Sequence, residues 1–273
     1  MTLEDAARRA IAGDRAAQEQ LAGALQGGIY GLSLRMLCNR EDAEDATQEI
    51  LIRIVTRLSQ FDFRSKLKTW AYRVAVNYIL DLKKSATERL QMTFEQLAED
   101  ITSGLGEAVL PEVEESLLVE EIKIGCSMGM LQCLDRNHRL AYTLGEIMEM
   151  QGPEAAEILD VSPELFRKRL QLARKEMLHF MKSYCGLISD KAPCRCNRQI
   201  SSGLRSGRIH EERCNYAAAS RSFTQIRTMV QQVEEARWAL QVHRTNHPRE
   251  ASVDFTRRLI GILAINPASN GQT

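Results

Sequence analysis

Hydrophobic residues recur three and four positions apart along most of this chain, which is the spacing of one face of an α-helix. The clearest run covers residues 40–58, where the positions that share a face are Ala43, Ala46, Ile50, Ile54 and Leu58. β-Branched residues do not alternate with polar ones as they would in strands. The sequence therefore predicts an all-α protein.

Breaks in the pattern set the expected helix ends. The first helices cover about residues 3–38, and we expect an interruption at Gly27 and Gly28, because consecutive glycines are costly inside a helix. A new helix begins after Asn39, a residue that favours the N-cap position. Further helical runs are expected at about residues 114–184, 211–243 and 252–263.

Residues 61–84 combine a hydrophobic and a basic face. The face expected to be buried comprises Leu67, Trp70, Ala71, Val74, Tyr78 and Leu82, and the polar face comprises Lys66, Thr69, Arg73, Asn77 and Lys84. Phe61 and Phe63 precede this helix, in and beside a short loop. Aromatic rings with positive charge suit single-stranded nucleic acid, since bases stack on rings and cations follow phosphates. A solvated amphipathic helix is the alternative.

The helix after Asn39 carries a second face of mixed character. Asp45, Gln48 and Glu49 lie on one stripe with Ile52, an aliphatic residue that water does not favour. Either this is a solvated helix face, or it is a docking surface for a basic partner helix, and the spacing leaves both open.

Residues 152–177 read as a helix-turn-helix. A short helix is followed by a tight turn at Asp160 and Val161, after which Ser162 and Pro163 start a second helix. Ala155, Ala156, Ile158, Leu159, Val161, Phe166 and Leu170 are spaced to fill the core between two crossing helices. The second helix presents Arg167, Lys168, Gln171, Arg174 and Lys175 outward, which suits contact with duplex DNA.

The formal net charge of the 273 residues is zero, but the charge is unevenly distributed. Residues 64–84 hold six Lys or Arg against one acid, and residues 163–198 hold nine against three. Between them, residues 95–121 hold nine Asp or Glu and neither Lys nor Arg. This pattern favours two modules that face nucleic acid, joined by a linker that does not.

Other classes of protein find little support in the sequence. A Gly-rich phosphate loop, a His-Glu metal motif and a nucleophile elbow are missing, so the chain is not expected to be an enzyme. No run of 18 apolar residues occurs, and the N-terminal residues do not resemble a signal peptide. We expect a cytoplasmic protein without a membrane partner.

With its three motifs in this order, the chain resembles the extracytoplasmic-function (ECF) sigma factors of bacterial RNA polymerase. "REDAEDATQEILIRIV" is similar to the polymerase-binding helix of that family, and "FDFRSKLKTWAYRVAVNYILDLKK" to its promoter-melting segment. "AAEILDVSPELFRKRLQLARKEM" is similar to its upstream helix-turn-helix. The resemblance covers about residues 10–184.

The resemblance implies a role for each surface. Asp45, Gln48, Glu49 and Ile52 would bind the clamp of the polymerase largest subunit, and the flap would be a further contact. Single-stranded −10 DNA would contact Phe63, Arg64, Lys66, Arg73, Asn77 and Lys84. Duplex −35 DNA would contact Ser162, Arg167, Lys168, Gln171, Arg174 and Lys175. An anti-sigma factor is a further partner that the resemblance suggests.

The expected organisation follows from the same motifs. Residues 1–84 form a sigma region 2-like domain, 85–113 an acidic linker with at most short helices, and 114–184 a region 4-like domain. Two positions depart from the family pattern. Asp160 stands where a glycine is common, so this Asp must adopt a left-handed conformation, and Thr47 stands where an aliphatic residue is usual.

Residues 185–273 extend beyond the resemblance and contain four of the seven cysteines: Cys185, Cys194, Cys196 and Cys214. Such a cluster suits zinc or another soft metal, although the spacing is a weak signal because it contains one Cys-x-Cys pair and no Cys-x-x-Cys. A packed or docking extension that regulates in cis is the alternative. Cys38, Cys126 and Cys133 fall on helical core positions and are expected to be buried.

A different function accounts for part of the same sequence. A dimeric helix-turn-helix regulator would explain residues 152–177 but would leave the other two motifs without a role. Dependence on polymerase separates the two hypotheses, because a sigma factor binds promoters specifically only with the core enzyme.

Overall fold

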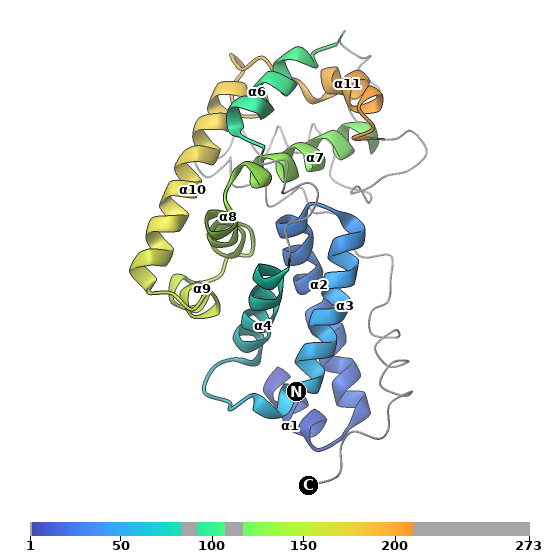
Figure 1. The fold of residues 1–273 in the computed structure, drawn as a ribbon, viewed down its shortest axis with the longest axis vertical. Helices are drawn as coiled ribbons and strands as arrows, with labels where there is room; N and C mark the ends of the chain where they lie inside the picture. Colours follow the sequence, from blue (N-terminus) through green and yellow to red (C-terminus); the bar gives the residue numbers. More distant parts are fainter. Residues whose placement is uncertain (1, 83–91, 107–116, 210–273) are drawn as a thin grey trace. The chain divides into compact units, whose positions relative to one another are not determined.

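The computed structural model describes residues 2–82, 92–106 and 117–209. Within these ranges every regular element is helical, which confirms the all-α prediction, and β pairing is limited to one bridge between Cys185 and Cys194. In chain order the elements are α1 (Leu3–Ile11), α2 (Arg15–Leu37), α3 (Arg40–Thr56), η1 (Leu58–Gln60), α4 (Leu67–Asp81), α6 (Phe94–Ser103), α7 (Leu117–Cys133), α8 (Arg136–Tyr142), the π-helix η3 (Thr143–Ile147), α9 (Gly152–Ile158), α10 (Pro163–Tyr184), η4 (Cys196–Gln199) and α11 (Ile200–Arg205) (Figure 1). Among these, no helix is long and apolar enough to span a lipid bilayer.

The chain forms two compact units. Of the described residues, unit 1 contains 2–82 together with 153–162, and unit 2 contains 92–152 and 163–209. The division into four parts inferred from the sequence, with boundaries after residues 84, 113 and 184, stays a prediction.

Unit 1 is a helical bundle in which α2 packs against α1, α3 and α4 (Figure 1). Local capping explains where its helices start. Thr2 and Asp5 form a reciprocal capping box on α1, and Asp14 caps α2 while it pairs with Arg9. Asn39 caps α3 as predicted, with its side-chain oxygen 2.9 Å from the backbone nitrogen of Asp42.

The expected interruption at Gly27 and Gly28 is wrong, because α2 runs through both residues and the break falls at residues 12–14 instead. A Cβ on Gly28 would lie 2.0 Å from the phenolic oxygen of Tyr72 on α4. Glycine at this position therefore allows α2 and α4 to approach closely, and their packing offsets the low helix propensity of glycine.

The expected core positions of residues 40–58 are confirmed, since Ala43, Ala46, Ile50 and Ile54 of α3 and Leu58 of η1 are all buried. The expected face of α4 is partly wrong. Leu67 and Ala71 are buried as expected, but the remaining buried positions are Thr69, Tyr72, Ala75, Val76 and Ile79. Trp70, Val74, Tyr78 and Leu82 are only half-buried. Because α4 contacts α1, α2 and α3, it buries a wider face than one stripe.

Unit 2 is built around α7 and α10. α6, η4 and α11 pack on α7, and α8 and α6 pack on α10. The ring of Phe94 at the start of α6 lies 5.3 Å from that of Phe180 on α10, measured between centroids. The described part of the expected linker, residues 92–106, is thus joined to unit 2 through a capped helix.

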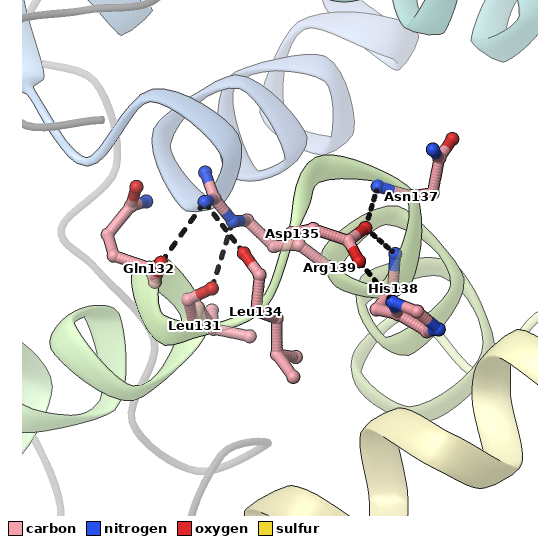
Figure 2. Close-up of polar contacts among 7 residues, drawn as sticks. All are labelled: Leu131, Gln132, Leu134, Asp135, Asn137, His138 and Arg139. Atoms are coloured by element: carbon pink, nitrogen blue, oxygen red, sulfur yellow. Dashed lines mark hydrogen bonds and ion pairs between the residues drawn. The ribbon is translucent and has the colours of Figure 1, made fainter. Parts of the chain in front are cut away.

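A polar junction connects α7 to α8 (Figure 2). The buried guanidinium of Arg139 donates to the carbonyl oxygens of Leu131 and Leu134, at 2.9 and 3.0 Å, and so satisfies the C-terminal end of α7. Asp135 accepts hydrogen bonds from the first backbone N–H groups of α8. The angle between the two helices is therefore fixed by hydrogen bonds at both ends of the turn.

Candidate nucleic-acid and partner interfaces

The acidic stripe predicted on α3 is present on the surface of unit 1. Asp45 is exposed, while Gln48, Glu49 and Ile52 are half-buried beside it. These positions lie three and four residues apart, so their side chains share one side of the helix. The stripe therefore offers negative charge with a small apolar area, which suits a basic partner surface.

Two neighbours of this stripe are missing from the sequence-based prediction. Arg53 pairs with Glu49 at 3.1 Å, and its guanidinium lies 4.4 Å from the ring centre of Tyr78 on α4. Burial, and then the carboxylate of Glu49, raise the pKa of Tyr78. Sequence spacing could have suggested Arg53, which is four residues after Glu49, but only the packing of α3 on α4 brings Tyr78 to the same surface.

The loop before α4 is tied to the bundle by its backbone. Lys66 at the N-cap position makes no side-chain cap, and the N–H of Leu67 instead donates to Glu4 of α1 at 3.1 Å. Arg64 pairs with Asp62 and keeps 88% of its side chain exposed. A fixed loop thus presents two cations, Arg64 and the exposed Lys66, to an anionic partner.

Phe63 is held in place and is not a free ring. Its backbone has φ = 60°, a left-handed conformation that is unusual for a bulky residue. Its ring centre lies 4.6 Å from that of Phe61, and the guanidinium carbon of Arg8 lies 4.6 Å from the Phe63 ring centre. A base that stacks here would therefore contact the half-buried ring of Phe63, which is held in place by the buried Phe61 and by Arg8.

Arg73 already has hydrogen-bond partners. Its Nε donates to the carbonyl oxygen of Glu157 at 3.1 Å, and the hydroxyl of Thr69 donates to Glu154 at 3.0 Å. Both acceptors lie in the part of α9 that belongs to unit 1. Arg73 can contact DNA only if its hydrogen bond to Glu157 is replaced by one to DNA. Asn77, by contrast, is exposed. Lys84 lies outside the described residues.

The basic face of α10 is exposed on unit 2. Phe166 and Leu170 are buried as predicted, and the expected DNA-facing residues are all exposed: Ser162, Arg167, Lys168, Gln171, Arg174 and Lys175.

Asp160 has φ = 52°, so the turn adopts the predicted left-handed conformation. Thr47 is the second position that departs from the family pattern. It is buried, and its hydroxyl donates to the carbonyl oxygen of Ala43 at 2.6 Å.

Arg174 has a structural contact as well. It forms an ion pair with Glu146 on η3, whose side chain is 2% exposed. A buried carboxylate needs a compensating charge. Arg174 therefore stabilises unit 2, and its place among the DNA-contacting residues stays a prediction.

The cysteines differ from expectation. Cys38, Cys126 and Cys133 are half-buried, not fully buried, and Cys38 ends α2 with φ = 52°. Cys185 and Cys196 are half-buried and Cys194 is buried, while Cys214 lies outside the described residues. Within the described part of the chain, no group of three or more His, Cys, Asp or Glu residues could hold a metal ion.

The comparisons with known proteins agree with this arrangement. The family model for sigma-70 region 2 matches residues 21–89, which include α3 and α4. The ECF RNA polymerase sigma factor SigW of Bacillus subtilis is 29% identical over 177 residues, which cover 60% of this chain and 89% of that protein. The RNA polymerase sigma-H factor of Pseudomonas aeruginosa is 28% identical over 166 residues, or 60% of this chain and 85% of its own length.

Proposed function

Because the chain belongs to the ECF sigma factors of bacterial RNA polymerase, we propose that it brings core polymerase to promoters and recognises them at the −10 and −35 elements. The observation that carries this proposal is the match of the region 2 model to the segment that exposes the acidic stripe of α3 and the basic loop before α4. A sigma factor performs no catalysis itself, and this role would place the chain in the cytoplasm.

The α3 stripe is the surface that would bind the clamp of the largest subunit. Its carboxylates, Asp45 and Glu49, would pair with basic side chains, and Ile52 would be covered by the partner. Arg53 would orient Glu49 for this contact, since it holds the carboxylate from one side and stacks on Tyr78 from the other. The flap of the polymerase is proposed as the contact of unit 2. An anti-sigma protein that covered the α3 stripe would block the clamp contact.

The loop and polar face of α4 would hold the non-template strand of the −10 element. Arg64 and Lys66 would contact phosphates, and the ring cluster at Phe63 would support a base taken out of the duplex. Arg73, Asn77 and Lys84 would continue the contact along the strand. Each surface alone would bind weakly, and attachment of both units to one polymerase raises their effective concentration at the promoter.

The −35 element would be contacted as duplex DNA by α10. Its N-terminal half offers Arg167 and Gln171 for base edges, while Lys168 and Lys175 would bind phosphates.

Equilibrium binding to core polymerase tests the clamp surface. The variant Asp45→Ala/Gln48→Ala/Glu49→Ala should bind core about tenfold more weakly or worse, which corresponds to a loss of at least about 1.4 kcal/mol. The matched control is Glu19→Ala/Gln20→Ala, which removes an exposed acid and amide from α2 and should leave the affinity unchanged. Equal affinities for both variants would contradict the assignment of this stripe.

A further inference from the structure

Two exposed leucines lie on the basic helix α10. Among the residues that the structure describes, four large hydrophobic side chains are strongly exposed, and two of these are Leu165, at 40%, and Leu172, at 41%. The other two, Ile11 and Leu80, lie on separate helices of unit 1. A single exposed leucine is ordinary on a protein surface. Two on one strongly charged helix point to a surface that is covered when a partner binds.

The two leucines share one side of α10. They are seven residues apart, which is close to two full turns, so their side chains leave the helix in nearly the same direction. Lys168 lies three residues after Leu165, and Lys175 lies three residues after Leu172; both lysines are exposed. Leucine and lysine therefore alternate along this side of the helix.

This side of α10 is separate from the side that packs into unit 2. The helix buries one stripe along its first four turns: Phe166, Leu170, Ala173 and Met177. Leu165 and Leu172 each precede a buried residue by one position, which places them about 100° away from it around the helix axis. Arg174, which pairs with Glu146 of unit 2, lies two residues after Leu172 and so on the opposite flank. The leucines therefore face away from both the core and the Arg174 ion pair.

The charge beside the leucines is mainly positive. Residues 164–176 contain five Lys or Arg and two acids, Glu164 and Glu176. Glu164 pairs with Arg167 at 3.3 Å, which compensates one of these positive charges. The remaining excess of positive charge favours a polyanionic partner over a neutral protein groove.

The major groove of DNA offers an apolar group to such a helix. Each thymine presents its C5-methyl group there, and aliphatic side chains can pack on it. In a helix-turn-helix, the N-terminal residues of the second helix reach the base edges. Leu165 is the third and Leu172 the tenth residue of α10, so both lie in its N-terminal half. They are about 10 Å apart along the helix axis, which corresponds to roughly three base-pair steps.

The lysines fit the same arrangement. A lysine side chain can lay its aliphatic stem along an apolar neighbour while its ammonium group reaches further out. Lys168 and Lys175 would thus reach phosphates at the edge of the groove, and the shorter leucines between them would meet the bases.

We propose that Leu165 and Leu172 are specificity-determining residues of the −35 contact, and that each packs on the methyl group of a thymine in the major groove. This inference rests on the proposed function and deepens it, because it states what the −35 element contains: two thymines, on either strand, about three base pairs apart. The DNA contacts predicted from the sequence are all polar or charged side chains, and they omit both leucines.

An exposed apolar stripe can also dock on a protein. The basic residues beside the leucines would then face an acidic surface, and the affinity for core polymerase would depend on the leucines even when no DNA is present. Binding of the variants to core polymerase alone distinguishes this case from DNA contact.

Deoxyuridine in place of thymidine removes only the methyl group and therefore measures the proposed contact directly. A promoter that depends on this chain is first identified from its transcription start site, and each thymine of its −35 element, on either strand, is replaced in turn. The wild-type holoenzyme should lose about fourfold in affinity at two positions, roughly the contribution of one buried methyl group at each.

The leucine variants assign each position. Leu165→Ala and Leu172→Ala should each abolish the effect of deoxyuridine at one of the two positions and leave the other. Ile11→Ala removes an equally exposed aliphatic side chain from unit 1 and should retain both effects. Because both leucines are exposed, the variants should unfold at the same temperature as the wild type.

Two results would overturn this inference and leave the proposed function intact. The first is an unchanged affinity of the wild-type holoenzyme for every deoxyuridine promoter, or an unchanged sensitivity in both leucine variants. The second is weaker binding of the leucine variants to core polymerase without DNA, which would assign the leucines to a protein contact. If the wild type yields no chain-dependent promoter, the proposed function fails and this inference fails with it.

Discussion

The phenolic oxygen of Tyr72 on α4 lies 2.0 Å from the point that a Cβ on Gly28 of α2 would occupy. Tyr72 is 3% exposed, so its ring cannot move away without disturbing the core of unit 1. The two residues are 44 positions apart in the sequence, and they fix how closely the helix that leads to the acidic stripe approaches the helix that carries the basic face.

Replacement of Gly28 should therefore destabilise the protein although alanine is the better helix former. Gly28→Ala should lower the free energy of unfolding by about 1–3 kcal/mol, the usual cost of overpacking a core. Gly27→Ala is the matched control, since nothing lies within 4 Å of its added Cβ, and it should stabilise by about 0.5–1 kcal/mol. Urea denaturation followed by circular dichroism measures both. Equal effects of the two substitutions would contradict the close approach.

The ionisation of Tyr72 predicts a loss of stability at high pH. Burial raises the pKa of Tyr72 to about 12, above the ordinary value of 10. The folded state holds the phenol proton of Tyr72 more tightly than the unfolded state does. The contribution of this proton to the free energy of unfolding is therefore complete below pH 10 and is lost as the pH rises toward 12. Its size is about 2–3 kcal/mol. Tyr72→Phe should lose less stability than the wild type between pH 9 and about pH 11, in urea titrations at each pH. If the free energies of unfolding of the two proteins fell in parallel as the pH rises, the predicted effect of Tyr72 ionisation would be contradicted.

The pair of Arg174 and Glu146 predicts a structural effect on a surface expected to bind DNA. Arg174→Ala should lower the free energy of unfolding by about 1–3 kcal/mol, because the buried carboxylate loses a partner. Glu146→Gln in the same chain should recover part of this loss, which a double-mutant cycle measures. Lys175→Ala, next to it and exposed, should change the stability by less than about 0.5 kcal/mol.

The exposed lysines of α10 should act through phosphates. In promoter binding by the polymerase holoenzyme, Lys168→Ala/Lys175→Ala should reduce the slope of log affinity against log salt by about two, because each phosphate that a lysine neutralises adds roughly 0.9 to that slope. Lys191→Ala removes an exposed lysine outside α10 and should leave the slope unchanged. An unchanged slope in the double variant would show that these two lysines do not contact DNA.

Features that depend on neighbouring residues could be read from the sequence. Asp160 adopts the left-handed turn conformation that the family resemblance implies, while Asn39 caps α3 and the small and aliphatic face of α3 is buried, as the local pattern predicts. Propensity, capping and helical spacing are properties of a few consecutive residues, so these predictions needed no knowledge of the fold.

The failures involve residues brought together over long distances. Gly28 is accommodated in α2 because Tyr72 packs closely on it, and Thr69 is buried because α4 is covered on several sides. Likewise the pairing of Arg174 with Glu146 spans 28 residues. Helical spacing describes one helix at a time and carries no information on which helix will be its neighbour.

The most direct test of the central claim is transcription from fragmented genomic DNA of the source organism by bacterial core polymerase, with the 5′ ends of the products sequenced. Core with this chain should produce discrete start sites that core alone does not, and these should be lost with Asp45→Ala/Gln48→Ala/Glu49→Ala. Absence of chain-dependent start sites, together with tight binding of the chain alone to palindromic duplex DNA, would contradict the account and identify a dimeric regulator.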